Sequence, residues 1–282
     1  MIYTLEDEPV LQNPVMVSAL SGWVDAGAVG TSAATHLAGD GRLIASFDPD
    51  ALFDYRSQRP ILDIVDGVMT QVVWPEVVLR HAVVGGKDLL LLTGQEPDLG
   101  WKRFSDAVAE LAARFKVVQL VTLGSVPAAV PHTLPSPILT TASDPDLLAG
   151  DVRPPSGLLR VPAAAVSMVD RQVAGTGIPT VGFFVQVPHY APGPYPPGVV
   201  ALLQRLAVHL GIDIPLESLE EDAKTHRIQL DELIAGQPEA QEHVRSLESM
   251  QADQPIVSGE ELASEIERYL RNAPPGDQGN QG

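Results

Sequence analysis

The chain has 282 residues, 45% of them hydrophobic, which is enough to bury the core of one large domain with an appendage. Its 36 acidic and 18 basic residues give a net charge of −18. A chain this acidic repels phosphate backbones and anionic membrane surfaces, which argues against binding to nucleic acids or membranes. It has no cysteine, which excludes disulfides, thiolate metal sites and a cysteine nucleophile.

The N-terminus is acidic and lacks the basic-then-apolar order of a signal peptide. No apolar run approaches the length that spans a bilayer. The seven histidines do not cluster at ligand spacings, so we expect no metal site and no cofactor. Together with the absence of cysteine, these features lead us to expect a soluble cytoplasmic protein.

The first predicted strand, Val15–Leu20, ends in the loop Ser21-Gly22-Trp23-Val24-Asp25-Ala26-Gly27. A helix is expected over Ala26–Ala38, so this loop is a strand-to-helix turn of the kind at which open α/β sheets form ligand crevices. Two interpretations of the loop stay open. Either Asp25 and Trp23 belong to a binding site, or Asp25 accepts from free amides of the next helix and Trp23 covers the core.

A long loop follows the second predicted strand, Leu43–Phe47, and carries the segment Phe53-Asp54-Tyr55-Arg56 and then Arg59. Aromatic and arginine side chains are typical of interface hot spots, so Tyr55, Arg56 and Arg59 are candidate binding residues. The alternative is local pairing of the two arginines with Asp48, Asp50 and Asp54.

Two alternating apolar runs within Ile61–Thr70 flank the dipeptide Asp66-Gly67. This dipeptide favours a tight turn between antiparallel strands. We therefore predict a hairpin at this point, which interrupts the alternation of strands and helices.

The strand Asp88–Thr93 is followed by a second junction, which contains Glu96 and Asp98 and leads into the expected helix Leu99–Phe115. Trp101 lies at the start of that helix. The strand Val117–Leu123 opens into a third junction, which ends in His132. The carboxyl ends of parallel strands meet at one edge of a sheet, so we expect Trp23, Asp25, Glu96, Trp101 and His132 to converge there.

Carboxylates beside a histidine are able to perform acid–base chemistry, as in a hydrolase or a nucleosidase. Against this interpretation, the chain lacks Gly-x-Ser-x-Gly, His-Glu-x-x-His and Gly-x-Gly-x-x-Gly, and Gly85-Gly86-Lys87 does not have P-loop spacing. Glu96-Pro97-Asp98 also suits the opening of a helix, and His132 after a proline also suits a turn. We therefore expect no catalytic residues.

A helix over Pro162–Ala174 and a strand over Pro179–Gln186 complete the alternation. The pattern predicts an α/β fold with a mostly parallel sheet flanked by helices. A proline-rich loop then carries Tyr190 and Tyr195, which either form an exposed contact or pack over the sheet edge.

Beyond Pro215 the sequence becomes helical and charged, with leucines at three- and four-residue steps from Leu216 to Leu233. This seam packs either within the chain or on another subunit. Further helices are expected over Glu239–Met250 and Glu260–Asn272. We predict a core over residues 1–211, a C-terminal helical region over 212–272 and a disordered tail over 273–282.

The three junctions, with the Phe53–Arg59 segment between them, resemble the PAC2 family, named for a proteasome assembly chaperone and often labelled ATP-grasp. The resemblance covers roughly residues 10–235 and is strongest to actinobacterial-type members. It implies a phosphorylase/hydrolase-like core and a non-catalytic, proteasome-assembly-chaperone-like role that depends on protein–protein contacts. Family members also form closed assemblies, so we expect a homo-oligomer, with a trimer as the subunit number, in which the region after Pro196 and the Phe53–Arg59 segment make contacts.

Assembly chaperones of this family dock through a terminus that ends in a hydrophobic residue, a tyrosine and any residue. The sequence ends in Asn280-Gln281-Gly282, so docking by that route is not expected. The alternative function is a small-molecule hydrolase, a nucleosidase-like enzyme or a ligand binder that uses the strand-end crevice.

Overall fold

The computed structural model describes residues 2–148 and 157–253. Its strands are β1 (Tyr3–Leu5), β2 (Val15–Ser21), β3 (Arg42–Phe47), β4 (Ile61–Val65), β5 (Val68–Val73), β6 (Val77–Val84), β7 (Lys87–Gln95), β8 (Gln119–Ala128), β9 (Ile138–Ala142) and β10 (Thr180–Pro188). Its α-helices are α1 (Val29–Ala38), α2 (Pro49–Leu52), α3 (Trp101–Arg114), α4 (Ala165–Gly175), α5 (Pro196–Leu210), α6 (Glu217–Ala235) and α7 (Pro238–Asp253).

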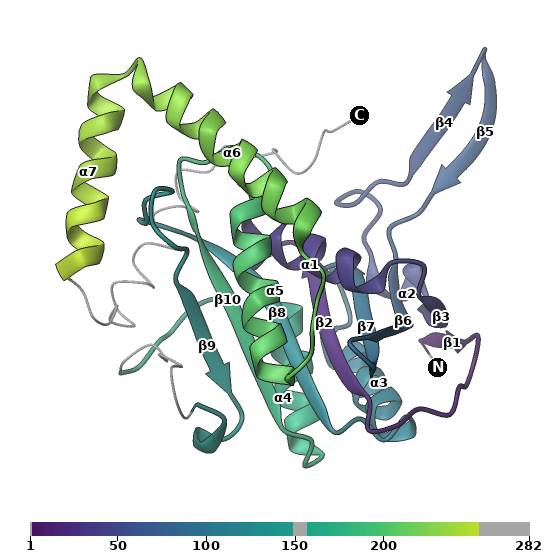
Figure 1. The fold of residues 1–282 in the computed structure, drawn as a ribbon. Coiled ribbons are helices and arrows are strands. Elements are labelled where there is room, and N and C mark those ends of the chain that lie inside the picture. The colour runs from purple at the N-terminus through teal and green to yellow at the C-terminus, as the bar shows by residue number, and fades with distance from the viewer. Residues whose placement is uncertain (1, 149–156, 254–282) are drawn as a thin grey trace.

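Within these residues the main sheet has eight strands in the order β1-β3-β6-β7-β2-β8-β10-β9 (Figure 1). The four central strands, β7, β2, β8 and β10, are parallel to their neighbours in this group. The outer strands pair antiparallel: β6, β3 and β1 on one side and β9 on the other. The predicted α/β fold is thus confirmed, with a parallel centre inside a mixed sheet.

Three of the outer strands, β1, β6 and β9, were not predicted from the sequence. At β6 the missed signal is the turn into β7. This turn consists of Gly85-Gly86, which have φ values of 55° and 77°. Two successive positive φ values form the tight turn that joins antiparallel strands, whereas a parallel pair requires a long crossover. The double glycine is therefore a hairpin turn.

Helices cover both faces of the parallel centre, with α1 and α5 on one face and α3 and α4 on the other (Figure 1). Strand β7 shows why its sequence is a continuous apolar run. Leu89 and Leu91 pack into the core beneath α1 and α5, while Leu90 and Leu92 pack into the core beneath α3 and α4. A strand buried on both faces requires apolar residues at every position.

The helix expected over Ala26–Ala38 is divided in two. A 3₁₀ turn spans Ala26–Ala28, where Gly27 and Ala28 have φ values of 62° and 51°, and α1 begins at Val29. The predicted hairpin is present as β4 and β5, and Asp66 and Gly67 at its turn have φ values of 52° and 81°. These two values belong to the turn type that an Asp-Gly pair favours.

The C-terminal helices extend from the core as a separate layer (Figure 1). Most of the leucine seam packs within the chain against the core that α5 covers: Leu230 is 3% exposed and Leu216 and Leu219 pack against the same core, whereas Leu233 is 57% exposed. The helix predicted over Glu260–Asn272 and the tail over 273–282 lie outside the described residues, and the domain boundary at residue 212 stays a prediction. Among the described residues, none of the helices combines the length and apolar character that crossing a membrane requires.

Candidate functional site

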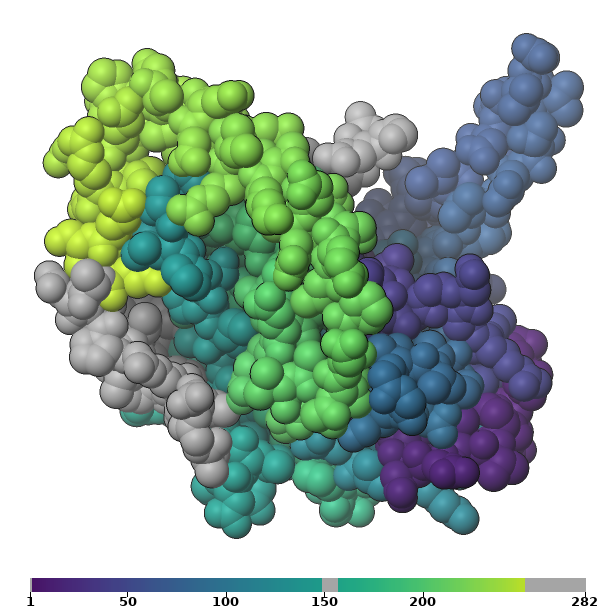
Figure 2. All heavy atoms as spheres, in the orientation of Figure 1, coloured from purple at the N-terminus to yellow at the C-terminus, as the bar shows by residue number. Residues whose placement is uncertain are grey.

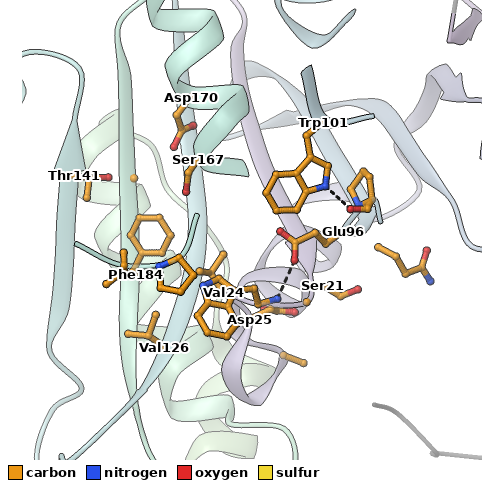
Figure 3. A pocket seen from close by; sticks show the side chains of 18 of the residues that line it. Ser21, Val24, Asp25, Glu96, Trp101, Val126, Thr141, Ser167, Asp170 and Phe184 are labelled. Atoms are coloured by element: carbon orange, nitrogen blue, oxygen red, sulfur yellow. Dashed lines mark hydrogen bonds between the residues drawn. The ribbon is translucent and has the colours of Figure 1, made fainter. Parts of the chain in front are cut away.

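A wide groove of about 2260 Å³ runs along the face of the sheet that carries α4 (Figure 3). Its walls come from the loop after β2, the loop after β7 and the segment after Tyr55. Its floor and far wall come from α4 and from β8, β9 and β10. Of the candidate residues named from the sequence, the groove is lined by Trp23, Asp25, Arg56, Arg59, Glu96, Asp98 and Trp101.

Asp25 accepts three hydrogen bonds at the start of α1. Its Oδ1 accepts from the backbone nitrogens of Gly30 (2.8 Å) and Thr31 (3.1 Å), and its Oδ2 accepts from the Thr31 hydroxyl (2.5 Å). Burial raises the pKa of Asp25, and the hydrogen bonds from Thr31 and Gly30 oppose that rise. Ala28 occupies the N-cap position of α1, and the Asp25 carboxylate accepts from free amides of the first turn as a capping side chain does, which holds the loop after β2 in place.

Glu96 has a similar positional role at a second helix. Its Oε1 accepts from the backbone nitrogen of Ala165, the first residue of α4, at 2.6 Å. Its Oε2 accepts from the backbone nitrogen of Trp23 at 3.2 Å. This one carboxylate therefore joins the loop after β2, the loop after β7 and the start of α4 (Figure 3).

The other two candidates of this junction also make local contacts. Asp98 Oδ2 accepts from the backbone nitrogen of Asp54 at 2.9 Å, which ties the loop after β7 to the segment before Tyr55. The indole nitrogen of Trp101 donates to the carbonyl oxygen of Pro97 at 2.5 Å. The polar groups of this junction thus hold loops together around the groove.

The segment around Tyr55 is held by its own aspartates. Arg56 donates to both carboxylate oxygens of Asp54, at 3.2 and 2.9 Å, which is the local pairing considered from the sequence. The Tyr55 hydroxyl donates to Asp50 at 2.5 Å, and its ring packs on Trp74 with centroids 5.0 Å apart. Arg59 is exposed at the groove. The interface role of this segment stays a prediction.

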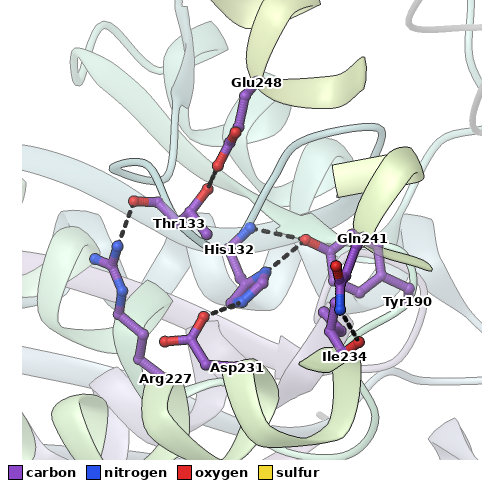
Figure 4. A network of polar contacts seen from close by, with 8 residues as sticks. All are labelled: His132, Thr133, Tyr190, Arg227, Asp231, Ile234, Gln241 and Glu248. Carbon is purple, nitrogen blue, oxygen red and sulfur yellow. Dashed lines mark hydrogen bonds and ion pairs between the residues drawn. The ribbon is translucent and has the colours of Figure 1, made fainter. Parts of the chain in front are cut away.

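His132 does not line the groove with the other candidates (Figure 4). The Tyr190 hydroxyl accepts from the His132 backbone nitrogen at 2.9 Å and lies 2.8 Å from the ring Nδ1. The carboxylate of Asp231 in α6 only accepts hydrogen bonds, so the ring Nε2 donates to it at 3.1 Å. In the neutral ring Nδ1 is then an acceptor, and the Tyr190 hydroxyl donates to it.

This arrangement gives the loop after β8 the role of an anchor for the C-terminal helices. The neighbouring Thr133 accepts from Arg227 of α6 through its carbonyl oxygen at 2.6 Å and donates its hydroxyl to Glu248 of α7 (Figure 4). Tyr190 packs edge-on against the His132 ring, and Tyr195 is 1% exposed. Tyr195 is therefore buried and Tyr190 is partly buried against His132, and a ligand contact by His132 stays a prediction.

The groove is also lined by residues of α4 and of strands β9 and β10 that were not predicted from the sequence. These are Ser167 and Asp170 of α4, Thr141 of β9 and Phe184 of β10 (Figure 3). The available signal was the spacing of Ser167 and Asp170, three residues apart on a predicted helix and thus on one face. Nothing local indicated that strand β9 would bring Thr141 opposite them.

The strand-end carboxylates accept backbone amides, so the geometry gives Asp25 and Glu96 positional roles more readily than acid–base roles. Within the part of the chain that the structure describes, no three His, Asp or Glu side chains come together as metal ligands. The groove combines aromatic, hydroxyl and carboxyl groups, which is the lining of a binding surface.

The model of the PAC2 family matches residues 19–234. The Mycobacterium tuberculosis unknown function protein Rv2714 is 35% identical with a TM-score of 0.88, covering 95% of this chain and 96% of that one. The M. tuberculosis proteasome-assembly chaperone homologue Rv2125 is 31% identical with a TM-score of 0.76, covering 82% and 99%. Pyrococcus furiosus PbaB, an archaeal proteasome activator, shares the fold at 17% identity and a TM-score of 0.65, covering 82% and 97%. Comparison with curated proteins gives no match.

Proposed function

Because the chain belongs to the PAC2 family, we propose that it acts through contacts with other proteins and with its own copies, as an assembly factor similar in role to proteasome assembly chaperones. The similarity to Rv2125, described as a proteasome-assembly chaperone homologue, supports a role of this kind. The observation that carries the proposal is the surface of the β4–β5 hairpin.

The hairpin projects from the body as an arm (Figures 1 and 2). Every residue from Ile61 to Trp74 is exposed, and the arm presents large apolar side chains to water. Their exposed fractions include 72% for Met69, 65% for Ile61 and 63% for Val68. A patch of this kind on a single chain marks a contact with another protein.

Both faces of the arm are apolar. Ile61 pairs with Val73 and Leu62 pairs with Val72, and successive pairs along a strand face opposite sides. A two-stranded hairpin alone in water is marginally stable, and its open edges favour pairing with further strands. A partner that covers only one face would leave the other face wet, so the arm requires contacts on both sides.

A second copy of this chain is the occupant that the arm fits best. In a closed ring, each arm inserts between neighbouring copies, so equivalent surfaces of those copies bury both faces of every arm. The C-terminal seam offers less for this purpose, since Leu216, Leu219 and Leu230 already pack against the core that α5 covers. We therefore propose a closed homo-oligomer, with a trimer as the expected subunit number, in which the arm makes the principal contact.

Sedimentation equilibrium tests this proposal with two double variants, Ile61→Thr with Val73→Thr, and Leu62→Thr with Val72→Thr. Threonine keeps the branched shape that strands favour while it removes apolar surface from one face of the arm at a time. We expect each variant to weaken self-association by at least about tenfold, as for hot-spot residues. The matched control is Val208→Thr, at an isolated exposed valine of α5.

Salt provides a second readout of the same contact. Copies with a net charge of −18 repel one another, and salt screens that repulsion, so association should strengthen as salt is added. A wild-type chain that sediments as a single species at the 30.0 kDa monomer mass would refute self-association. Variants of both faces that assemble like the wild type would refute the role of the arm.

The partner is tested with purified proteasome subunits from the same host. We expect the oligomer to bind assembly intermediates and to speed their conversion to complete particles on native gels. The arm variants should lose this effect, and the Val208→Thr control should keep it. Unchanged assembly kinetics, with no bound intermediate, would refute the proteasome-related role and leave the self-association result standing.

The enzyme alternative has less support. A general acid or base needs a carboxyl group free to meet its substrate, whereas Asp25 and Glu96 use their oxygens to accept hydrogen bonds from helix and loop amides. His132 is engaged with Tyr190 and Asp231 away from those carboxylates. These contacts favour a protein-interaction role.

A further inference from the structure

A row of polar and small residues crosses four strands beneath α4. In the register of the sheet, Ser18 of β2 stands beside Thr122 of β8, Thr122 beside Gly182 of β10, and Gly182 beside Thr141 of β9. Ser18 and Thr122 are completely buried, on the face of the sheet whose apolar core α3 and α4 cover. Buried hydroxyl groups in such a layer require hydrogen-bond partners.

The row continues through a chain of hydrogen bonds into α4. The Thr122 hydroxyl donates to Asp170 Oδ1 at 2.5 Å and lies 2.7 Å from the Ser18 hydroxyl. Because Thr122 gives its only hydroxyl proton to Asp170, the bond between Ser18 and Thr122 is donated by Ser18. The sheet therefore presents an oriented chain of donors to one oxygen of the Asp170 carboxyl.

The second oxygen of Asp170 has no hydrogen-bond partner among the described residues. The side chain points from α4 into the groove, together with Ser167 from the preceding turn (Figure 3). Burial raises the pKa of Asp170 to about 7, and the bond from Thr122 opposes the rise. A half-buried carboxyl whose second oxygen has no partner within residues 2–148 and 157–253 is suited to receive an external donor.

An aromatic platform lies beside this carboxyl. The ring of Phe184 lies against two positions without side chains, Gly124 of β8 and Gly182 of β10. A Cβ atom at Gly124 or at Gly182 would come within 2.7 Å of the ring. The two glycines thus let the ring rest on the sheet backbone, with its other face toward the groove.

The register places the platform and the carboxyl next to each other. Phe184 and Gly182 are two residues apart on one face of β10, and Gly182 is the neighbour of Thr122, which holds Asp170. Thr141 lies on the outer side, where its hydroxyl would be 2.8 Å from a Cβ at Gly182. A ligand that rests on the ring therefore has Thr141 on its outer side and Ser167 and Asp170 of α4 beside it in the groove.

We propose that this part of the groove binds an organic cation, with its amine, amidine or guanidinium group on Asp170 and its flat or apolar part on the Phe184 ring. Each feature selects for this class. One oxygen of the Asp170 carboxylate accepts from Thr122, and the other faces the groove. That second oxygen makes its strongest hydrogen bond to a positively charged donor. An aromatic face attracts cations and flat groups. The net charge of −18 also attracts cations toward the groove and repels anions.

A pH dependence follows from the same geometry. A cation on Asp170 favours the ionised carboxylate, so binding should strengthen as the pH rises through the range in which Asp170 loses its proton. The groups that face Asp170 from β2 and β8 are neutral hydroxyls. The other charged side chains that line the groove are Asp25, Glu96, Asp98, Arg56, Arg59 and Arg171.

The test uses four probes of the same size with the full-length protein: benzamidine, benzylamine, the neutral benzamide and the anionic benzoate. Affinities are measured by isothermal titration calorimetry and by ligand-observed saturation-transfer NMR at several pH values. We expect the two cations to bind at least about tenfold more tightly than benzamide, because charge-assisted hydrogen bonds are the stronger ones. Benzoate should not bind.

Three variants locate the site. Asp170→Asn keeps an acceptor for Thr122 but removes the charge, and we expect about a tenfold or greater loss of benzamidine affinity together with loss of its pH dependence. Phe184→Leu keeps an apolar side chain without the aromatic face, and should weaken binding several-fold. Asp222→Asn, at an exposed position of α6, is the matched control and should bind like the wild type.

Two results would overturn the proposal. One is absence of binding by both cations, or equal binding of benzamide. The other is benzamidine binding that Asp170→Asn and Phe184→Leu leave unchanged, which would assign the probe to a different surface. Either result is independent of the self-association tests, since those depend on the hairpin arm.

Discussion

The hairpin arm and the polar row beneath α4 are both exceptions to the rule that apolar side chains are buried and polar ones are exposed. The arm exposes apolar side chains, and the row buries polar ones. The arm places Ile61, Met69 and Val72 in water, and the row places Ser18 and Thr122 in the interior. Apolar side chains in water are stabilised when a partner covers them, whereas buried hydroxyls are stabilised within the chain by their own hydrogen bonds. The first region therefore depends on another molecule, and the second depends on the tertiary structure of this one.

The comparison predicts that single changes in the row affect folding, while single changes in the arm affect association. The largest effect on folding is expected for Thr122→Val. Valine has the same shape but leaves Ser18 and Asp170 without their partner, which should lower the free energy of unfolding by about 2–3 kcal/mol. Urea unfolding at low protein concentration measures it.

Thr122→Ser is the control for this change, because it keeps the hydroxyl group and should stay within about 1 kcal/mol of the wild type. If valine and serine at position 122 give the same stability, the hydrogen-bond chain contributes nothing, and the row would be an ordinary part of the core.

The second effect, for Asp170→Asn, depends on pH. The pKa of Asp170 is raised in the fold from 3.8 to about 7, so the folded state holds its proton longer than the unfolded state. The stability linked to this group is thus fully present below about pH 4 and is lost as the pH rises through 7. Asparagine carries no charge, so the variant should be more stable than the wild type at pH 8.

We expect a gain of about 1–2 kcal/mol at pH 8, because one oxygen faces the groove and keeps part of the solvation that full burial would remove. At pH 4 the variant and the wild type should unfold alike. Denaturant unfolding across this pH range gives the comparison. A difference that is the same at pH 4 and pH 8 would show that the carboxyl does not titrate as described.

The third effect concerns Asp25. Its carboxylate accepts three hydrogen bonds, whereas that of Asp170 accepts one. Asp25→Asn keeps an acceptor for the amides of Gly30 and Thr31, but it places a donor opposite the Thr31 hydroxyl. We expect a loss of about 1 kcal/mol, as for other helix caps, measured by thermal unfolding. Unchanged melting with loss of a ligand or partner would instead assign Asp25 to binding.

The smallest effect on folding is expected in the arm. Val73→Thr changes a side chain that is 45% exposed and should alter the unfolding free energy of dilute protein by less than about 0.5 kcal/mol. At high protein concentration it should lower the melting temperature more, because association stabilises the wild type by mass action. Equal effects at both concentrations would place the arm in the folding core of the single chain.

Much of the fold was predictable because its signals are local. The apolar run of β7, the Asp66-Gly67 turn and the leucine spacing of α6 each describe an element within a few residues of sequence. The short outer strands were missed, because Tyr3–Leu5 and Ile138–Ala142 are too brief to show a period. The loops after β2 and β7 that line the groove follow strand ends that the sequence shows, but the position of His132 depends on Tyr190 and Asp231, which are 58 and 99 residues away in the chain.

The sequence by itself determined the family, the α/β alternation and the hairpin, since each follows from residue types at short spacing. Only the tertiary structure decided that Ser18, Thr122, Gly182 and Thr141 share one row, and that Asp170 and Phe184 meet above it. Those residues lie on four strands and one helix and are brought together by strand register. Register is set by the packing of whole faces against helices, which no short segment of the chain encodes.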